Sequence, residues 1–156
     1  MRYLAFKKSI VFFLLLSTGL LLNAQASTDS FMITIKTDNT GSSGDTEFTI
    51  PTSTTTTYNY SVDCNSDGTY ESTGESANYT CSYGVAGSYQ ITIDGTFPHI
   101  YFNNEGDKEK ILSVDQWGIG SWSSMRKAFY GASNLVINDP LAPNLMNVGS
   151  TERMFS

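Results

Sequence analysis

Hydrophobic and polar residues alternate along much of the stretch from Ser27 to Pro98, and no window of about eleven residues there has a helical apolar period. The alternating runs are 31–36, 47–50, 57–63, 78–83 and 88–93. Segments rich in Gly, Asn, Asp and Ser separate them, at 38–44, 65–68 and 84–87, and such residues are typical of turns. Short strands with turns at regular spacing predict a small antiparallel β-sandwich.

The pattern changes after Gly95. An apolar run at 96–102 predicts a further strand, a charged loop follows at 103–110, and β character returns at 111–118. Beyond this, Met125, Ala128 and Phe129 have the i, i+3, i+4 spacing of one apolar helix face. A serine at 123 or 124 is suited to cap such a helix, so a short helix is predicted over 122–129.

The second half also contains a repeat. Residues 124–129 align with residues 150–155 at an offset of 26, and a serine, a basic residue, an apolar residue and a phenylalanine recur. Asn-Leu pairs lie between the two copies, at 134–135 and 144–145. A period of this length, combined with Asn-Leu units, is typical of leucine-rich repeats.

The N-terminus has the pattern of a secretory signal. Residues 1–8 are basic, 9–22 are largely apolar, and 23–26 end in an Ala-x-Ala sequence. The alternative is a membrane anchor, but the apolar run has about 14 residues, short of the roughly 20 that span a bilayer. We therefore predict a signal peptide at 1–26, cleavage after Ala26, and a secreted or cell-surface protein with no membrane span after cleavage.

The charge balance narrows the range of partners. The chain has 15 acidic and 9 basic residues and a net charge of −6, and the segment 1–26 holds three of the bases and no acid. The remainder therefore carries −9, which argues against binding nucleic acid or anionic lipid. One His and two Cys argue against a His- or Cys-rich metal site. We expect no cofactor, and a protein or glycan ligand at the cell exterior.

The two cysteines, Cys64 and Cys81, are expected to form a disulfide, because an exported chain meets an oxidising compartment. Closing a loop of about 18 residues stabilises a fold by roughly 3 kcal/mol in the chain-entropy model. The alternative is a nucleophilic cysteine assisted by His99, and nothing in the spacing supports that pair.

One short motif matches the opening of a calcium loop. Asp63, Asn65, Asp67 and Gly68 follow the pattern D-x-N-x-D-G. A calcium loop needs a carboxylate at its twelfth position, which here is Gly74. We interpret the motif as an Asp-Gly turn after a strand, and keep weak Ca²⁺ binding by the three polar residues as the alternative.

The β-rich part resembles a polycystic-kidney-disease (PKD) type immunoglobulin-like domain. The residues that carry the resemblance are 60–69, which read YSVDCNSDGT, and 79–93, which read YTCSYGVAGSYQITI. Cys64 stands where the family often has Trp, and Cys81 lies two residues before the matching Tyr83. The resemblance covers about residues 30–96 and implies that a disulfide replaces part of the usual aromatic core.

The second half resembles the 26-residue repeat of the BspA-like leucine-rich-repeat family of bacterial surface proteins. The matching residues are 125–135 and 143–155, preceded by a lead-in at 96–118. Ala132 and Thr151 depart from the family, which usually has Cys and Met at these positions. The resemblance implies a solenoid and contact with host or matrix proteins.

We therefore predict a mainly β chain with three parts: a signal peptide at 1–26, a PKD or immunoglobulin-like sandwich at 27–96, and at 97–156 a lead-in, a first repeat and an incomplete second repeat. Solenoids need about three repeats to bury a continuous core. We accordingly expect a truncated chain with an under-covered apolar edge, formed by Phe129, Leu135, Leu145, Met154 and Phe155.

The chain contains no G-x-S-x-G or H-E-x-x-H motif and no phosphate-binding glycine loop, and we predict that it is not an enzyme. The expected function is adhesion or protein binding, with the sandwich as spacer and the repeats as recognition surface. One alternative is a carbohydrate-binding accessory module of a secreted hydrolase system, and another is an inactive truncated product. Candidate binding residues are Trp117, Trp122 and Tyr130. Seven aromatics are suited to sugar stacking, but we favour the interpretation that they fill the core and the strand faces: Tyr58, Tyr60, Tyr70, Tyr79, Tyr101, Trp117 and Trp122.

Overall fold

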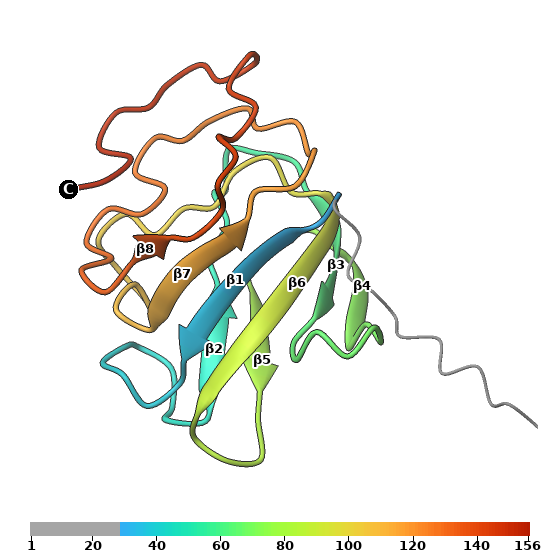
Figure 1. Ribbon diagram of the computed structural model, residues 1–156, viewed down its shortest axis with the longest axis vertical. Helices are drawn as coiled ribbons and strands as arrows, with labels where there is room; N and C mark the ends of the chain where they lie inside the picture. Colours follow the sequence, from blue (N-terminus) through green and yellow to red (C-terminus); the bar gives the residue numbers. More distant parts are fainter. Residues whose placement is uncertain (1–28) are drawn as a thin grey trace, which may run out of the picture.

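The computed structural model describes residues 29–156, so the signal peptide predicted at 1–26 lies outside the described residues. The described chain is mainly β and has no helix (Figure 1). Its strands are β1 (Phe31–Lys36), β2 (Glu47–Ile50), β3 (Asn59–Asp63), β4 (Ser72–Glu75), β5 (Tyr79–Ser82), β6 (Ser88–Thr96), β7 (Ile111–Gln116) and β8 (Val136–Ile137). Within 29–156, no segment is a helix with the length and apolarity needed to cross a bilayer.

The strands form a six-stranded sheet in the order β4-β3-β6-β1-β7-β8 and a two-stranded sheet of β2 and β5. All pairs are antiparallel except β7 with β8. Alternate residues of the central strands, such as Ile33, Ile35 and Ile91, are fully buried, and Phe48 and Ile50 of β2 are buried in the same core. The period-2 pattern of the sequence thus gives the predicted sandwich-like core.

The segment after residue 96 shares this core. β7 pairs with β1 and extends the main sheet. Aromatic rings from both halves of the chain pack together. The centroid of the Phe31 ring lies 5.0 Å from that of Trp122 and 6.0 Å from those of Phe97 and Trp117. The boundary predicted between residues 96 and 97 therefore falls between two segments that belong to one hydrophobic cluster.

A buried ion pair in the loop before β7 also connects the second half of the chain to the first half. Asp107 and Lys110 have side chains that are essentially inaccessible, with Lys110 Nζ 4.0 Å from Asp107 Oδ1. Lys110 Nζ donates to the Ser43 and Gly44 carbonyls at 3.1 and 2.8 Å, and the Asp107 carboxylate accepts the Thr49 N–H at 2.7 Å. The loop after β1 and the loop before β7 are held together by these bonds.

Two expected elements are wrong. The strand predicted at 96–102 is absent beyond Thr96, where β6 ends, because Pro98 has no N–H for a ladder and the segment leaves the sheet. The helix predicted over 122–129 is a turn, in which Ala128 N donates to Met125 O at 3.1 Å and Lys127 has a φ of 54°. A left-handed residue ends right-handed helical geometry, so the apolar spacing belongs to a turn here.

Three short segments of the second half lie side by side, and we call them coil 1 (98–104), coil 2 (123–131) and coil 3 (149–156). Phe102 N donates to Ala128 O at 3.2 Å, which links coil 1 to coil 2. Four N–H groups of coil 2 donate to carbonyls of coil 3: Met125 to Ser150 (2.8 Å), Lys127 to Glu152 (2.8 Å), Phe129 to Met154 (2.9 Å) and Gly131 to Ser156 (2.9 Å). The resulting bridge between Phe129 and Phe155 is parallel.

The coils extend the molecule on one side of the sandwich. In Figure 1 the orange and red segments lie beyond β7 and β8, at the opposite edge of the sheet from β4. Coil 2 lies between coil 1 and coil 3, because it bonds to both. Within residues 29–156, coil 3 is therefore the outermost of the three coils.

Candidate interaction surface

Exposed hydrophobic side chains are concentrated at the coil side of the molecule. Of the nine large hydrophobic residues that are exposed in the described chain, seven follow residue 118. These seven are Ile119, Val136, Ile137, Leu141, Leu145, Met146 and Phe155. A concentration of exposed apolar side chains marks an interaction surface more often than isolated ones do.

The end of the stack is only partly covered. The Phe155 ring is 53% exposed and stacks on the Phe129 ring, with centroids 5.6 Å apart and planes 9° apart. Phe129 is 2% exposed because it lies between Phe155 and the core. Beside Phe155 lies an open apolar groove of about 380 Å³, lined by Phe129, Gly131, Ala132, Ser133, Leu135, Ile137, Phe155 and Ser156.

The apolar edge predicted from the sequence is present in part. Leu145 and Phe155 are exposed, whereas Leu135 and Met154 are half-buried against the core cluster. The prediction that Phe129 belongs to that edge is wrong, because coil 3 covers its ring. The sequence alignment identified the repeat, but it did not show that the second copy packs on the first.

Charged side chains cross between the outer two coils. Arg126 of coil 2 pairs with Glu152 of coil 3 at 3.2 Å, and both side chains are about half exposed. Arg153 lies over the Tyr130 ring, with its guanidinium carbon 5.6 Å from the ring centroid. Tyr130 is therefore half-buried under an arginine rather than presented as a free aromatic platform.

The other two candidate binding residues lie in the core. Trp117 and Trp122 are 3% and 2% exposed, and their rings meet edge to face with centroids 5.9 Å apart. Tyr58 and Tyr60, also considered for sugar stacking, are equally buried. These rings fill the interior and are not available to a sugar at the surface. Periodicity alone does not separate a core aromatic from a surface one.

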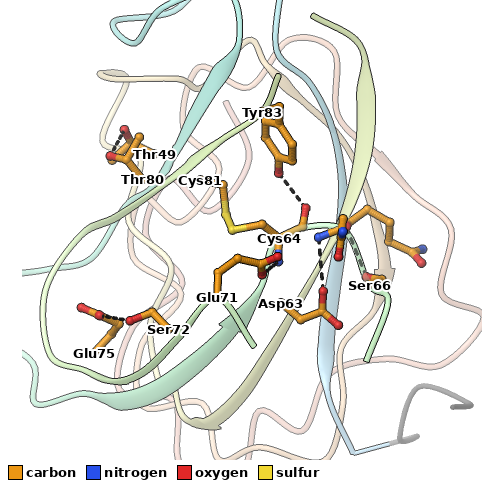
Figure 2. Close-up of a disulfide and its surroundings, with 12 residues drawn as sticks. Thr49, Asp63, Cys64, Ser66, Glu71, Ser72, Glu75, Thr80, Cys81 and Tyr83 are labelled. Carbon is orange, nitrogen blue, oxygen red and sulfur yellow. Dashed lines mark hydrogen bonds between the residues drawn. A yellow bond between two sulfur atoms is a disulfide. The ribbon is translucent and has the colours of Figure 1, made fainter. Parts of the chain in front are cut away.

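The disulfide between Cys64 and Cys81 is present and buried, with the Cα atoms 5.7 Å apart. Figure 2 shows the side chains that hold it: Tyr83 donates its hydroxyl to Cys64 O at 2.7 Å, and Glu71 accepts the Cys64 N–H at 2.6 Å. No cysteine is free in the described residues. The alternative of a nucleophilic cysteine is thereby wrong.

His99 is buried, and both cysteines are in the disulfide, so His99 does not activate a cysteine. Its Nε2 is 2.9 Å from Arg126 O, within coil 2. Burial lowers the pKa of His99 below its ordinary value. The hydrogen bond to the Arg126 carbonyl raises this pKa, and the nearby Arg126 charge lowers it, so the net shift is downward. The side chain therefore links coil 1 to coil 2 as a neutral ring.

The Asp63 motif forms a turn that satisfies its own carboxylate. Asp63 Oδ1 accepts the N–H groups of Asn65 and Asp67, each at 3.2 Å, and Oδ2 accepts that of Gly68 at 2.7 Å. Asn65 Nδ2 donates to Asp67 Oδ2 at 3.0 Å. Among residues 29–156, no cluster of three acidic, His or Cys side chains is arranged for a metal. The arrangement is the Asx turn expected after β3.

A tyrosine-lined groove beside the disulfide was not predicted. It has a volume of about 430 Å³ and is lined by Cys64, Asn65, Glu71, Tyr79, Thr80, Ser82, Tyr83, Gly84 and Tyr89. The Tyr83 and Tyr89 rings stack with centroids 3.7 Å apart and planes 12° apart. Burial raises the pKa of Tyr83 well above its ordinary value, and the nearby carboxyl of Glu71 adds to the shift. Tyr83 therefore stays a neutral hydrogen-bond donor.

No family model, curated protein or solved structure matches this chain.

Proposed function

We propose that this chain is a non-catalytic binding protein, secreted or displayed at the cell surface, in which the β-sandwich is a spacer and the stacked coils are the recognition part. In this proposal residues 1–26 are an export signal, the sandwich is of PKD or immunoglobulin-like type, and the coils begin a BspA-like leucine-rich repeat. The expected ligand is an extracellular protein, met in adhesion.

The observation that supports this proposal most strongly is the structural repeat that relates coil 2 to coil 3. The turn from Met125 to Ala128 recurs between Thr151 and Met154 with the same 3.1 Å hydrogen bond. The positive φ values recur at the same step, 54° at Lys127 and 51° at Arg153. The serine turns recur as well, because Ser124 Oγ accepts Arg126 N and Ser150 Oγ accepts Glu152 N. Stacked units of this kind offer an extended surface.

Two further features agree with the proposal. The disulfide is typical of a protein that folds in an oxidising compartment. Exposed side chains on the coil side include Leu141, 73% exposed, and Met146, 91% exposed. Large apolar side chains at such positions are common in surfaces that bind proteins.

The test is an adhesion assay of the purified protein on arrayed extracellular-matrix proteins. We expect saturable binding to at least one matrix protein, weakened by Met146→Glu on the coil side and unchanged by the matched variant Val85→Glu, on a sandwich loop and 70% exposed. Binding that responds equally to both variants, or no saturable binding to any matrix protein, contradicts the assignment of recognition to the coils.

A second candidate function, carbohydrate binding, is favoured by the tyrosine-lined groove. Tyr79 is half-buried at its wall, and Glu71 and Asn65 place polar atoms around it. Aromatic rings with a few polar groups are a common lining for small-molecule sites. On a glycan array this candidate predicts binding that Tyr79→Ala abolishes and Met146→Glu leaves intact. The absence of glycan binding, or indifference to Tyr79→Ala, contradicts it.

A further inference from the structure

The tyrosine-lined groove beside the disulfide lies in a part of the chain that has acidic side chains but no lysine or arginine. Residues 37–107 contain ten acidic residues and neither of these two bases. Lys36, which lies opposite Ser88 at the end of β1, is engaged by Asp38 at 3.0 Å. A groove in such surroundings attracts cations and repels anions.

Glu71 lines this groove, and one oxygen of its carboxylate has no hydrogen bond within the described chain. Its Oε2 accepts the Cys64 N–H at 2.6 Å, which holds the side chain beside the disulfide (Figure 2). None of the ion pairs formed by residues 29–156 includes Glu71, and the side chain is exposed. Glu71 is therefore a positioned negative charge without a counter-charge in this part of the chain.

Two stacked tyrosine rings give the groove a rigid aromatic wall. Tyr83 donates its hydroxyl to Cys64 O and Tyr89 donates its own to Val85 O, each at 2.7 Å. The centroids of the two rings are 3.7 Å apart. Because these hydrogen bonds and the stacking already fix both side chains, a ligand that binds against them causes little loss of side-chain freedom.

Tyr79 contributes the third ring of the groove, close to the carboxylates. The ring is half-buried, and its hydroxyl has no hydrogen-bond partner among residues 29–156. Burial raises the pKa of Tyr79, and the charges of Glu71 and Glu75 raise it further. The face of a tyrosine ring attracts cations, and a nearby carboxylate acts in the same direction.

We propose that this groove binds an organic ammonium ion, which lies against the rings of Tyr79, Tyr83 and Tyr89 with its charge toward the unpaired oxygen of Glu71. Aromatic rings are the usual lining of sites for such cations. The volume of about 430 Å³ is sufficient for a group of this size. A neutral sugar would contact the rings without using the Glu71 charge, and an anion would be repelled by it.

This site is separate from the recognition surface proposed for the coils. Where the inference rests on the second candidate function, carbohydrate binding, it restricts the sugar to one with a free amino group. A quaternary amine offers the same chemistry from a different source, so the experiment includes both.

The test is a titration of the ¹⁵N-labelled protein, followed by NMR of the amides and tyrosine rings, with two cations and their neutral counterparts. One pair is choline and its isostere with a tert-butyl group in place of trimethylammonium, and the other is methyl glucosaminide and methyl glucoside. We expect at least one cation to shift the Tyr79 and Tyr83 resonances with a Kd of about 1 mM or below. It should bind at least about fivefold more tightly than its neutral counterpart. The tighter cation identifies the source of the ammonium group.

Glu71→Gln tests the charge, because the glutamine oxygen can still accept the Cys64 N–H and the side chain keeps its size. The matched control is Glu105→Gln, which removes an exposed carboxylate from the loop before β7, outside the groove. We expect only the first to weaken binding of the cation, at least about fivefold, while both keep the wild-type circular dichroism spectrum. Tyr79→Leu keeps an apolar side chain without a ring face and should weaken binding at least about threefold.

The inference is overturned if neither cation shifts these resonances, if the neutral counterparts bind equally well, or if the two glutamine variants behave alike. Glycan binding that Tyr79→Ala abolishes and Glu71→Gln leaves unchanged would also overturn it, in favour of neutral sugars. Should the cations fail while matrix binding stays sensitive to Met146→Glu, the inference falls and the proposed function stands. Binding of a cation without adhesion to any matrix protein would mean the reverse.

Discussion

Replacing Lys110 by methionine removes the positive partner of the buried ion pair while keeping a side chain of similar length. The change deletes donors to the Ser43 and Gly44 carbonyls and leaves the Asp107 carboxylate buried beside an apolar group. Breaking a buried pair from one side costs about 3 to 5 kcal/mol, because the remaining charge stays buried without its ionic partner. This is a large part of the roughly 5 to 15 kcal/mol by which domains are stable.

The assay is thermal and urea unfolding, followed by circular dichroism. A loss of this size corresponds to a fall in Tm of about 10 to 20 °C for a domain of this length. The matched control is Lys108→Met, because Lys108 is partly exposed and its pair with Glu109 is long, at 3.9 Å. We expect that control to change the free energy of unfolding by less than about 1 kcal/mol. Equal, small effects of the two variants would refute the reasoning.

The same pair predicts a dependence on pH. Burial alone would raise the pKa of Asp107, but the N–H groups of Ser43 and Thr49 and the Lys110 charge outweigh it and hold the pKa below the ordinary 3.8. A depressed folded-state pKa contributes stability above the unfolded value, and this contribution is lost as pH falls through the folded value. Wild type should therefore lose stability below about pH 4 more steeply than Asp107→Asn. Parallel pH profiles of the two proteins would contradict this.

Two other stability measurements address the disulfide and the stack. Replacing Cys64 and Cys81 together by serine should lower the free energy of unfolding by about 3 kcal/mol, because the bond closes a loop between positions separated by 17 in the sequence. Urea unfolding checks this, and a loss below about 1 kcal/mol would show that the tyrosine packing around the bond suffices. Phe129→Ala should cost about 3 to 5 kcal/mol and Phe155→Ala less than about 1 kcal/mol, since only the first ring is buried. Similar losses for both would mean that the coils do not pack as described.

Much of the sheet could be predicted from the sequence, because alternating apolar residues mark strands that bury one face. β1 and β2 have the predicted bounds, and β6 begins where it was predicted. β4 was missed because Ser72–Glu75 is polar throughout and pairs with β3 through its backbone. β8 was missed because it has two residues and both are exposed.

The helix and the candidate site show where sequence patterns lose information. Met125, Ala128 and Phe129 are all buried although the segment is a turn, so their spacing is compatible with both a turn and a helix. The positive φ of Lys127 distinguishes the turn from a helix, and it cannot be predicted from the residue types of this segment. The disulfide could be predicted because two cysteines in a chain with an expected export signal usually pair in an oxidising compartment. The burial of Trp117 agrees with the favoured interpretation of the aromatics as core residues, but its place against the first half of the chain depends on β7 pairing with β1, which the sequence pattern did not show.

Amide hydrogen exchange at single residues tests the central claim, which is that coil 3 packs on coil 2 in parallel register. We predict slow exchange at Met125, Lys127 and Phe129, whose N–H groups donate to coil 3. We predict exchange close to the unstructured rate at Thr151, Arg153 and Phe155, because these exposed residues donate no backbone hydrogen bond within residues 29–156. Fast exchange in both sets, or protection in both, would contradict the account.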